Sequence, residues 1–143
     1  MLAGEESGGI AVETHIPERD GIWMGLILME FMALTGKSLS ALIDEVYGIV
    51  GSFVFKRNDL SLPQATKEAV VNLCAEGKID RIGKRAVGRV EDMDGYKFIL
   101  DPDTWVMIRP SGTEPVLRIY VEAANNQIAD EILRDVNTMI DRI

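Results

Sequence analysis

The sequence predicts an α+β fold: a C-terminal antiparallel sheet with two helices packed on one face, preceded by a helical remnant of an α/β domain. One observation is a change of pattern near residue 52, where two helical segments give way to short strands and helices. Another is the order strand, helix, three or four strands, helix after that point, which favours an antiparallel sheet covered on one face. We therefore expect the end of one domain over residues 1–51 and a C-terminal domain over 52–143.

Length, charge and cysteine usage narrow the class of protein. The 143 residues, 47% of them hydrophobic, suffice for one compact domain and a remnant of a second. A formal net charge of −8 repels nucleic acid and anionic membrane surfaces, so any anion site must be local. The single cysteine, Cys74, and the single histidine, His15, exclude an internal disulfide and a metal site built from Cys or His clusters. We expect Cys74 to be a buried apolar residue and the protein to be cytoplasmic.

Two helices are predicted in the first part. Asp20 is the expected cap of a helix over 21–35 that stops at Gly36, with apolar side chains around most of its circumference. Such a helix is typically buried on several sides. A second helix is expected over 38–51, with its apolar side chains on one stripe. The apolar run over 22–34 is too short to span a membrane.

The second part has the pattern of a mixed module. The expected elements are a strand over 53–55, a helix between Pro63 and Gly77, strands over 86–92, 96–100, 104–109 and 116–123, and a helix over 126–143. Asp94-Gly95 is a strong turn signal for a hairpin. The final helix is expected to place one apolar face on the sheet, made of Ala129, Leu133, Val136, Ile140 and Ile143.

The loop from Arg109 to Pro115 lies between two of the predicted strands and has the composition of an anion site. Ser111, Gly112 and Thr113 supply two hydroxyls, consecutive backbone N–H groups and a glycine free to turn. Arg109 and Arg118 flank the loop with guanidinium groups that can bind a phosphate through two hydrogen bonds each. Strand alternation directs Leu117 and Ile119 to the core and Arg118 away from it. The alternative is an ordinary hairpin loop with an ion pair from Glu114 to an arginine.

The amino-terminal loop is a weaker candidate. Glu5, Glu6 and Ser7 lie between glycines and could hydrogen-bond to sugar hydroxyls, although carboxylates in a glycine-rich tail are more often solvated. In the following segment, Arg19 either faces a ligand or pairs with Glu18 while Asp20 caps the helix. Because a natural protein seldom opens on a glycine-rich loop, we also expect the reading frame to extend upstream.

Three segments, in this order, resemble the α-D-phosphohexomutase family. They are Gly4-Glu5-Glu6-Ser7-Gly8-Gly9, His15-Ile16-Pro17-Glu18-Arg19-Asp20-Gly21-Ile22 and Arg109-Pro110-Ser111-Gly112-Thr113-Glu114-Pro115, the last followed by Leu117-Arg118-Ile119-Tyr120. The resemblance covers the whole chain and implies the end of the family's third domain followed by its fourth. Members of the family interconvert hexose 1-phosphates and 6-phosphates through a bisphosphorylated sugar and a phosphoserine.

The resemblance implies roles for individual residues. Glu5 and Ser7 are expected to contact two hydroxyls of the sugar. Arg19 stands where the phosphoglucomutase branch has a basic residue lining the active site. The residues expected to bind the phosphate that is not transferred are Arg109, Ser111, Gly112 and Thr113, with Arg118 as a second phosphate-contacting arginine.

The catalytic parts of the family have no counterpart in these residues. Its phosphoserine motif and its magnesium loop, Asp-Gly-Asp-x-Asp-Arg, belong to the first two domains and are absent from this sequence. The resemblance therefore implies no catalytic residue, metal ligand or cofactor in this chain, and magnesium in the parent enzyme. We expect the chain to act with the missing N-terminal domains of the same enzyme and to lack mutase activity alone.

The ligand implied by the resemblance is a hexose phosphate. Glu6 and the segment over 15–22 look more like phosphoglucomutases than phosphoglucosamine mutases, and many phosphomannomutase-type members carry a histidine in place of Gly9. This favours glucose phosphate, with mannose phosphate next. The alternative is a stand-alone anion-binding or regulatory module that uses residues 109–118 without the sugar loop. A nucleic-acid module is disfavoured by the charge of −8.

Overall fold

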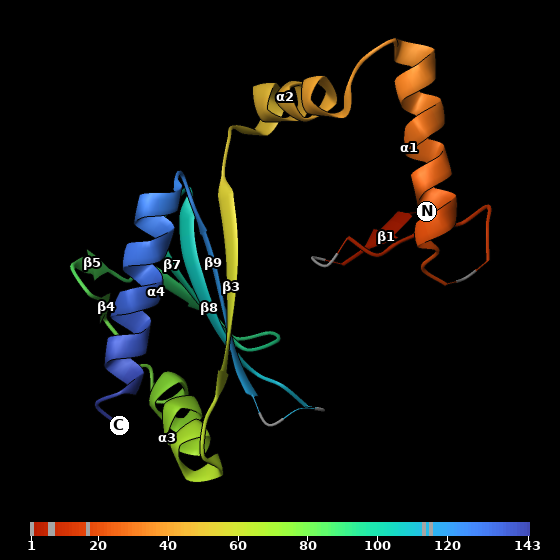
Figure 1. The fold of residues 1–143 in the computed structure, drawn as a ribbon. Coiled ribbons are helices and arrows are strands. Elements are labelled where there is room, and N and C mark those ends of the chain that lie inside the picture. Colours follow the sequence, from red (N-terminus) through yellow and green to blue (C-terminus); the bar gives the residue numbers. More distant parts are fainter. Residues whose placement is uncertain (1, 6–7, 17, 113, 115) are drawn as a thin grey trace. The chain divides into compact units, whose positions relative to one another are not determined.

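A computed structural model describes residues 2–5, 8–16, 18–112, 114 and 116–143 of the chain (Figure 1). It divides into two compact units, residues 1–51 and residues 52–143. The second unit contains a five-stranded antiparallel sheet with helices, and the first contains two helices. The predicted α+β fold class is therefore confirmed.

The first unit begins with a small antiparallel hairpin and continues into two helices. Strands β1 (Leu2–Gly4) and β2 (Ile10–Val12) pair with each other. Helix α1 (Gly21–Thr35) begins after Asp20, whose carboxylate accepts hydrogen bonds from two backbone N–H groups of the first turn. Helix α2 (Leu39–Val50) begins after Ser38. Both predicted helices are confirmed, whereas the hairpin was not predicted.

The helices of the first unit leave most of their apolar side chains exposed. Within α1, none of the described residues is buried, and Ile22 is 82% exposed. In α2 the predicted apolar stripe buries only Leu42. A helix of this composition is typically buried on several sides, and within the described residues nothing covers α1 in this way.

The sheet of the second unit has the strand order β3-β9-β8-β7-β6, with every neighbouring pair antiparallel. Its strands are β3 (Val54–Ser61), β6 (Arg89–Glu91), β7 (Tyr96–Asp101), β8 (Thr104–Pro110) and β9 (Val116–Ala123). Along β9 the residues of the apolar cluster are Leu117, Ile119, Val121 and Ala123, as the alternation predicted, and Tyr120 between them is also buried. The side chains between them point to the opposite face, which we call the second face of the sheet.

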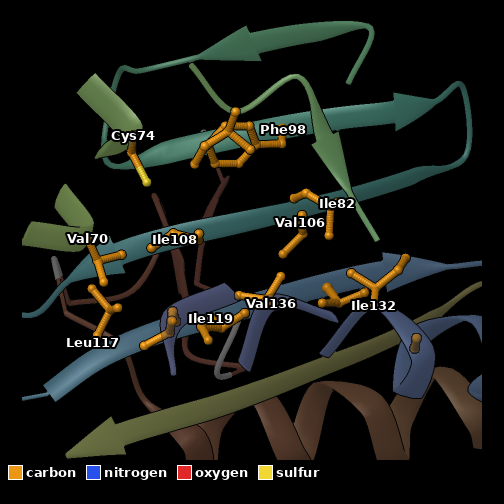
Figure 2. Packing of buried hydrophobic residues seen from close by; sticks show 14 of the residues in the cluster. Val70, Cys74, Ile82, Phe98, Val106, Ile108, Leu117, Ile119, Ile132 and Val136 are labelled. Carbon is orange, nitrogen blue, oxygen red and sulfur yellow. The ribbon is translucent and has the colours of Figure 1, made fainter. Parts of the chain in front are cut away.

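Two helices cover the first face of the sheet, α3 (Gln64–Ala75) and α4 (Asn126–Ile140), as Figure 1 shows. Side chains from α3 and α4 meet the strands in one apolar cluster. In Figure 2, Val70 and Cys74 from α3 lie with Phe98, Ile108 and Leu117 of the sheet. The predicted packing of two helices on one face is confirmed.

Several element boundaries differ from the prediction. Strand β3 is longer than the predicted strand over 53–55, because eight cross-strand pairs with β9 stabilise its polar sequence. The strand expected over 86–92 is divided into β5 (Arg85–Ala86) and β6. Here β5 pairs with β4 (Arg81–Ile82) through a turn at Gly83 that was not predicted. Helix α4 ends at Ile140, so Ile143 lies beyond the helix and is 48% exposed.

Candidate functional site

The sheet register brings together the charged residues beside the loop between β8 and β9. Arg109 and Arg118 are cross-strand partners, and Asp59 is the partner of Arg118 on its other side. Because cross-strand partners point to the same face, these three side chains form one row on the second face, at the end of the sheet next to the loop. Two arginines directly opposite each other repel, so the row requires negative charge nearby.

The loop itself is a short reversal between the two strands. The N–H of Ser111 donates to the carbonyl of Val116 at 3.1 Å, and the Ser111 hydroxyl accepts a hydrogen bond from the N–H of Glu114 at 3.2 Å. Gly112 is exposed, with open space around the position of a Cβ. Thr113, also predicted to bind phosphate, lies outside the described residues. The loop thus presents Ser111 and Gly112 between the two arginines.

Carboxylates hold both arginines. The Nη2 of Arg109 lies 3.1 Å from the Oδ2 of Asp94, and the Nη2 of Arg118 pairs with Glu114. The Nε of Arg118 is 3.9 Å from the Oδ2 of Asp59. The ion pair that the hairpin alternative predicted for Glu114 is therefore present, next to a cluster of cations that the alternative did not require.

Asp59 is the most firmly held of these carboxylates. Arg57, two residues earlier on the same face of β3, donates to both of its oxygens at 2.7 and 2.5 Å. The hydrogen bonds from Arg57, together with the charge of Arg118, lower the pKa of the Asp59 carboxyl below its ordinary value. Asp59 thus stays ionised and fixes one side of Arg118.

The turn between β6 and β7 also contacts the site, which the sequence interpretation did not anticipate. Gly95 has φ of 107°, and a Cβ there would lie 3.0 Å from both the Cβ of Arg109 and the carbonyl oxygen of Ile108. Only glycine fits this close approach, which brings the preceding Asp94 to Arg109. The Asp94-Gly95 signal predicted the turn correctly. Its contact with Arg109 depends on the pairing of β7 with β8, which local sequence does not specify.

The candidate sugar loop lies between β1 and β2 in the first unit. The N–H of Glu5 donates to the carbonyl of Gly9 at 2.9 Å, so the two described ends of this loop are hydrogen-bonded to each other. Ser7 lies outside the described residues. Arg19 pairs with Glu5 and also with Glu18 at 3.3 Å, and the hydrogen bond with Glu5 is the main cause of its raised pKa. The predicted pairing of Arg19 with Glu18 is thus one of two contacts.

The approach of Arg19 to Glu5 depends on Gly9. A Cβ at Gly9 would lie 2.9 Å from the Cδ of Arg19, so a side chain at this position would displace the arginine. Glu5 and Arg19, two residues singled out from the sequence, are therefore brought together within one unit. The roles of Glu5 and Arg19 toward a sugar stay predictions.

The only histidine supports the start of α1. His15 bonds to the Oδ2 of Asp20 at 2.8 Å through Nε2, and its ring stacks on Trp23 with centroids 4.7 Å apart. Asp20 has a lowered pKa, chiefly because its carboxylate accepts from the N–H of Trp23 and then because it bonds to His15. These contacts match the interpretation of Asp20 as a cap and of His15 as a satisfied loop residue.

Neither a metal cluster nor a single spanning helix is found in the described part of the chain. No group of three or more His, Cys, Asp or Glu side chains there is arranged to hold a metal ion. No described helix is by itself long and apolar enough to cross a membrane. The pair α1 and α2, bent by 87° at the break between them, passes the same test of length and composition together.

Comparison with protein families finds two successive matches in the chain. Residues 1–49 match the model described as phosphoglucomutase/phosphomannomutase, alpha/beta/alpha domain III. Residues 73–139 match the model described as phosphoglucomutase/phosphomannomutase, C-terminal domain. Both matches belong to one family and follow the order of its domains.

Similar proteins are several times longer than this chain. A phosphoglucomutase/phosphomannomutase of Thermococcus kodakarensis is 33% identical over 92% of the chain and 26% of its own length. A phosphoglucosamine mutase of Methanococcus aeolicus is 39% identical over 93% of the chain and 27% of its own length. A crystal structure of a phosphoglucomutase/phosphomannomutase family protein of Burkholderia thailandensis superposes with a TM-score of 0.65 at 26% identity, covering 96% of this chain and 27% of that one.

Proposed function

Because the chain belongs to the phosphoglucomutase/phosphomannomutase family and is homologous to the C-terminal quarter of its members, we propose that it binds the phosphate and the sugar of a hexose phosphate. The phosphate site comprises Arg109, Ser111, Gly112, Thr113 and Arg118. The sugar site comprises Glu5 and Ser7, with Arg19 beside them. The chain supplies binding groups and no catalytic residue.

The observation that carries this proposal is the pairing of Arg109 with Arg118 across the loop. Two guanidinium groups on neighbouring strands bring donors for an anion to one place in a chain whose net charge is −8, although carboxylates now balance their charge. A phosphate can accept two hydrogen bonds from each guanidinium, and the serine and glycine between them add a hydroxyl and backbone N–H groups. The sheet holds both strands in register, so the arginines are positioned before a ligand arrives.

The sugar part of the proposal rests on Glu5. Its carboxylate pairs with Arg19, which limits its rotation, and a carboxylate accepts hydrogen bonds from sugar hydroxyls. We propose that Arg19 positions Glu5 while Glu5 contacts the sugar. The favoured ligand is a glucose phosphate, with a mannose phosphate next. Glucosamine phosphate belongs in the same comparison because similar proteins are named phosphoglucosamine mutases.

We propose that the parent protein is a hexose phosphate mutase that works through a phosphoserine and magnesium. The chain spans about a quarter of the length of the curated relatives it matches. We therefore assign the phosphoserine and the magnesium site to domains outside this chain. Among the described residues, no cluster of His, Cys, Asp or Glu side chains fits a metal ion. The partners of the chain are then the N-terminal domains of the same enzyme, in the cytoplasm. The alternative is a stand-alone anion-binding or regulatory module, favoured by the fact that the loop lies entirely within the second unit.

A titration of the isotope-labelled chain with inorganic phosphate and with glucose 6-phosphate tests the phosphate site. The backbone amides of Ser111 and Gly112 should shift, with a dissociation constant in the millimolar range, because the site is open to solvent and ligand immobilisation offsets the charge-assisted hydrogen bonds. Arg109→Ala should weaken this binding at least tenfold, since it deletes a cation with two donors. Added salt should weaken it too.

The matched control is Arg89→Ala, which removes the same charge from β6, where Arg89 pairs with Glu91 and does not contact the loop. It should leave the titration unchanged. If the amides of Ser111 and Gly112 stay still while others shift, the loop is an ordinary hairpin. Equal affinity for inorganic phosphate and for glucose 6-phosphate would favour the stand-alone module over the sugar-binding proposal.

A further inference from the structure

The two arginines of the proposed phosphate site are already occupied by the protein's own carboxylates. Asp94 reaches Arg109 from the turn between β6 and β7, and Glu114 reaches Arg118 from the loop itself. An anion that uses the Nη2 groups of both arginines must displace these two carboxylates from them. The carboxylates therefore decide how readily the site accepts a ligand.

Asp94 and Glu114 differ from the third carboxylate of the row, Asp59. Asp94 is 70% and Glu114 56% exposed, and the ion pair of each joins it to a single guanidinium nitrogen. Asp59 is 35% exposed and is held through both oxygens by Arg57. Exposed single-contact ion pairs contribute little to stability and are screened by salt, so Asp94 and Glu114 can leave while Asp59 remains.

Arg118 has one donor that a ligand could satisfy. Its Nε is buried and has no hydrogen-bond partner among the described residues, and the nearest acidic oxygen recorded for it, on Asp59, is 3.9 Å away. A buried donor without an acceptor is unfavourable, and an acceptor that reaches it gains accordingly. A phosphate oxygen at this position would use Nε together with the Nη2 that Glu114 now holds.

The exchange requires rotation of side chains and no change of backbone. Gly95 packs its backbone against Arg109, and this contact fixes the turn that carries Asp94. Asp94 itself is at the tip of the turn and exposed, so its side chain can rotate into solvent. Glu114 has three side-chain torsions and the same freedom. The turn that carries Asp94 can therefore stay in place when the ligand enters.

We propose that Asp94 and Glu114 are exchangeable counter-ions of the phosphate site, which a doubly charged phosphate group displaces together. This inference rests on the proposed function, because it describes how that same site accepts its ligand. Two carboxylates with one charge each are replaced by one ligand with two charges, so the local charge balance is kept. A singly charged anion such as acetate replaces only one of them and leaves the other arginine paired.

The test compares the affinity for inorganic phosphate, at about pH 8 where phosphate is mostly doubly charged, of the full chain and of Asp94→Asn and Glu114→Gln. Each variant should bind phosphate about two- to fivefold more tightly than the unmodified chain, because the competing ion pair is removed. The matched control is Glu91→Gln, which removes the same charge from the same hairpin but from an ion pair with Arg89. It should change the affinity by much less.

A second measurement on the unmodified chain does not depend on any variant folding. Carbon-13 signals of the carboxyl groups of Asp94 and Glu114 should shift as phosphate is added, while that of Asp59 should not. Acetate at the same ionic strength should not move both signals together. These shifts, with tighter binding by both variants, would support the exchange.

Two outcomes would overturn the inference. Unchanged or weaker phosphate binding by Asp94→Asn and Glu114→Gln, with the unmodified chain still binding through Arg109, would mean that the carboxylates position the arginines and do not compete. In that case the proposed phosphate site stands and only the exchange is wrong. If neither the unmodified chain nor either variant binds phosphate, the proposed function fails and the exchange fails with it.

Discussion

At the scale of single residues, burial strongly changes the acid–base chemistry of the Cys74 thiol. Cys74 lies on α3 within the core, beside the strands of the sheet. Burial raises the pKa of its thiol from about 9 to about 12, because the thiolate would lose its hydration. The thiol therefore stays protonated and inert in the folded chain, as the sequence interpretation expected.

This burial predicts how stability depends on pH in the alkaline range. The unfolded chain loses the thiol proton near pH 9 and the folded chain holds it to about pH 12, so the contribution is complete below about pH 9 and is lost between these values. The difference in unfolding free energy between the unmodified chain and Cys74→Ala should shrink by about 1.4 kcal/mol per pH unit in this window. Urea unfolding at several pH values measures it. Parallel curves for both proteins would contradict the burial of the thiol.

The residues of the proposed phosphate site and their neighbours could be predicted from the sequence only in part. Arg109 and Arg118 were singled out because the loop composition is local and strand alternation directs Arg118 away from the core. Asp94 and Asp59 were missed as neighbours of the site, because each reaches it through a strand pairing between distant segments. One sequence signal for Asp59 was available. It follows Arg57 by two residues, a spacing that places both side chains on the same face of a strand.

At the scale of elements, helix α4 closes the first face of the sheet. Asn125 caps it by accepting from the N–H of Ile128 at 3.0 Å. Its apolar face includes Ile132 and Val136, both fully buried in the cluster. An amphipathic helix of this kind contributes to stability mainly through the face it buries, so its core residues and its solvent residues should respond very differently to substitution.

We predict that Ile132→Ala lowers the unfolding free energy of the second unit by about 2–5 kcal/mol, the range for deleting a large aliphatic side chain from a packed core. Arg134→Ala, two residues later on the exposed side of the same helix, should change it by less than about 0.5 kcal/mol. Urea unfolding followed by the fluorescence of Trp105 measures both, in a Trp23→Phe background so that only the second unit reports. Similar losses in the two variants would mean that α4 does not pack as described.

Elements with strong local signals were predicted well, and elements stabilised by partners were not. The caps Asp20 and Ser38 gave the starts of α1 and α2 directly. Most of β3 was not predicted because its central residues, Lys56 to Asp59, are polar and have low strand propensity. They form a strand because they pair with β9. The short pair β4 and β5 was missed because two-residue strands carry too little pattern.

At the scale of the whole molecule, the two units differ in how much apolar surface they bury. The second unit has a continuous core between its sheet and its helices. In the first unit, α1 is apolar around its circumference, yet none of its described residues is buried. Ile22, Leu26 and Met29 repeat at helical spacing and are 82%, 55% and 67% exposed. Such a surface exceeds what a monomer usually leaves in contact with water.

We therefore predict that the 143-residue chain self-associates through α1 and that residues 52–143 alone form a folded monomer. Burial of apolar side chains is the driving force, and α1 offers them on several sides. The double variant Ile22→Lys, Met29→Lys should shift the full chain toward monomer, because lysine is tolerated in helices and keeps one face hydrated. Light scattering over a range of protein concentrations measures the association in each case.

A matched control on the same helix, Glu30→Lys, distinguishes the effect of net charge on association from the effect of the apolar side chains. It changes the net charge by two, as the double variant does, but leaves Ile22 and Met29 in place. If association is apolar, Glu30→Lys should still associate and the double variant should not. If Glu30→Lys dissociates the chain equally well, repulsion between copies explains the effect and the apolar argument is wrong. A monodisperse monomer for the unmodified chain would refute self-association itself and imply that α1 is covered in solution.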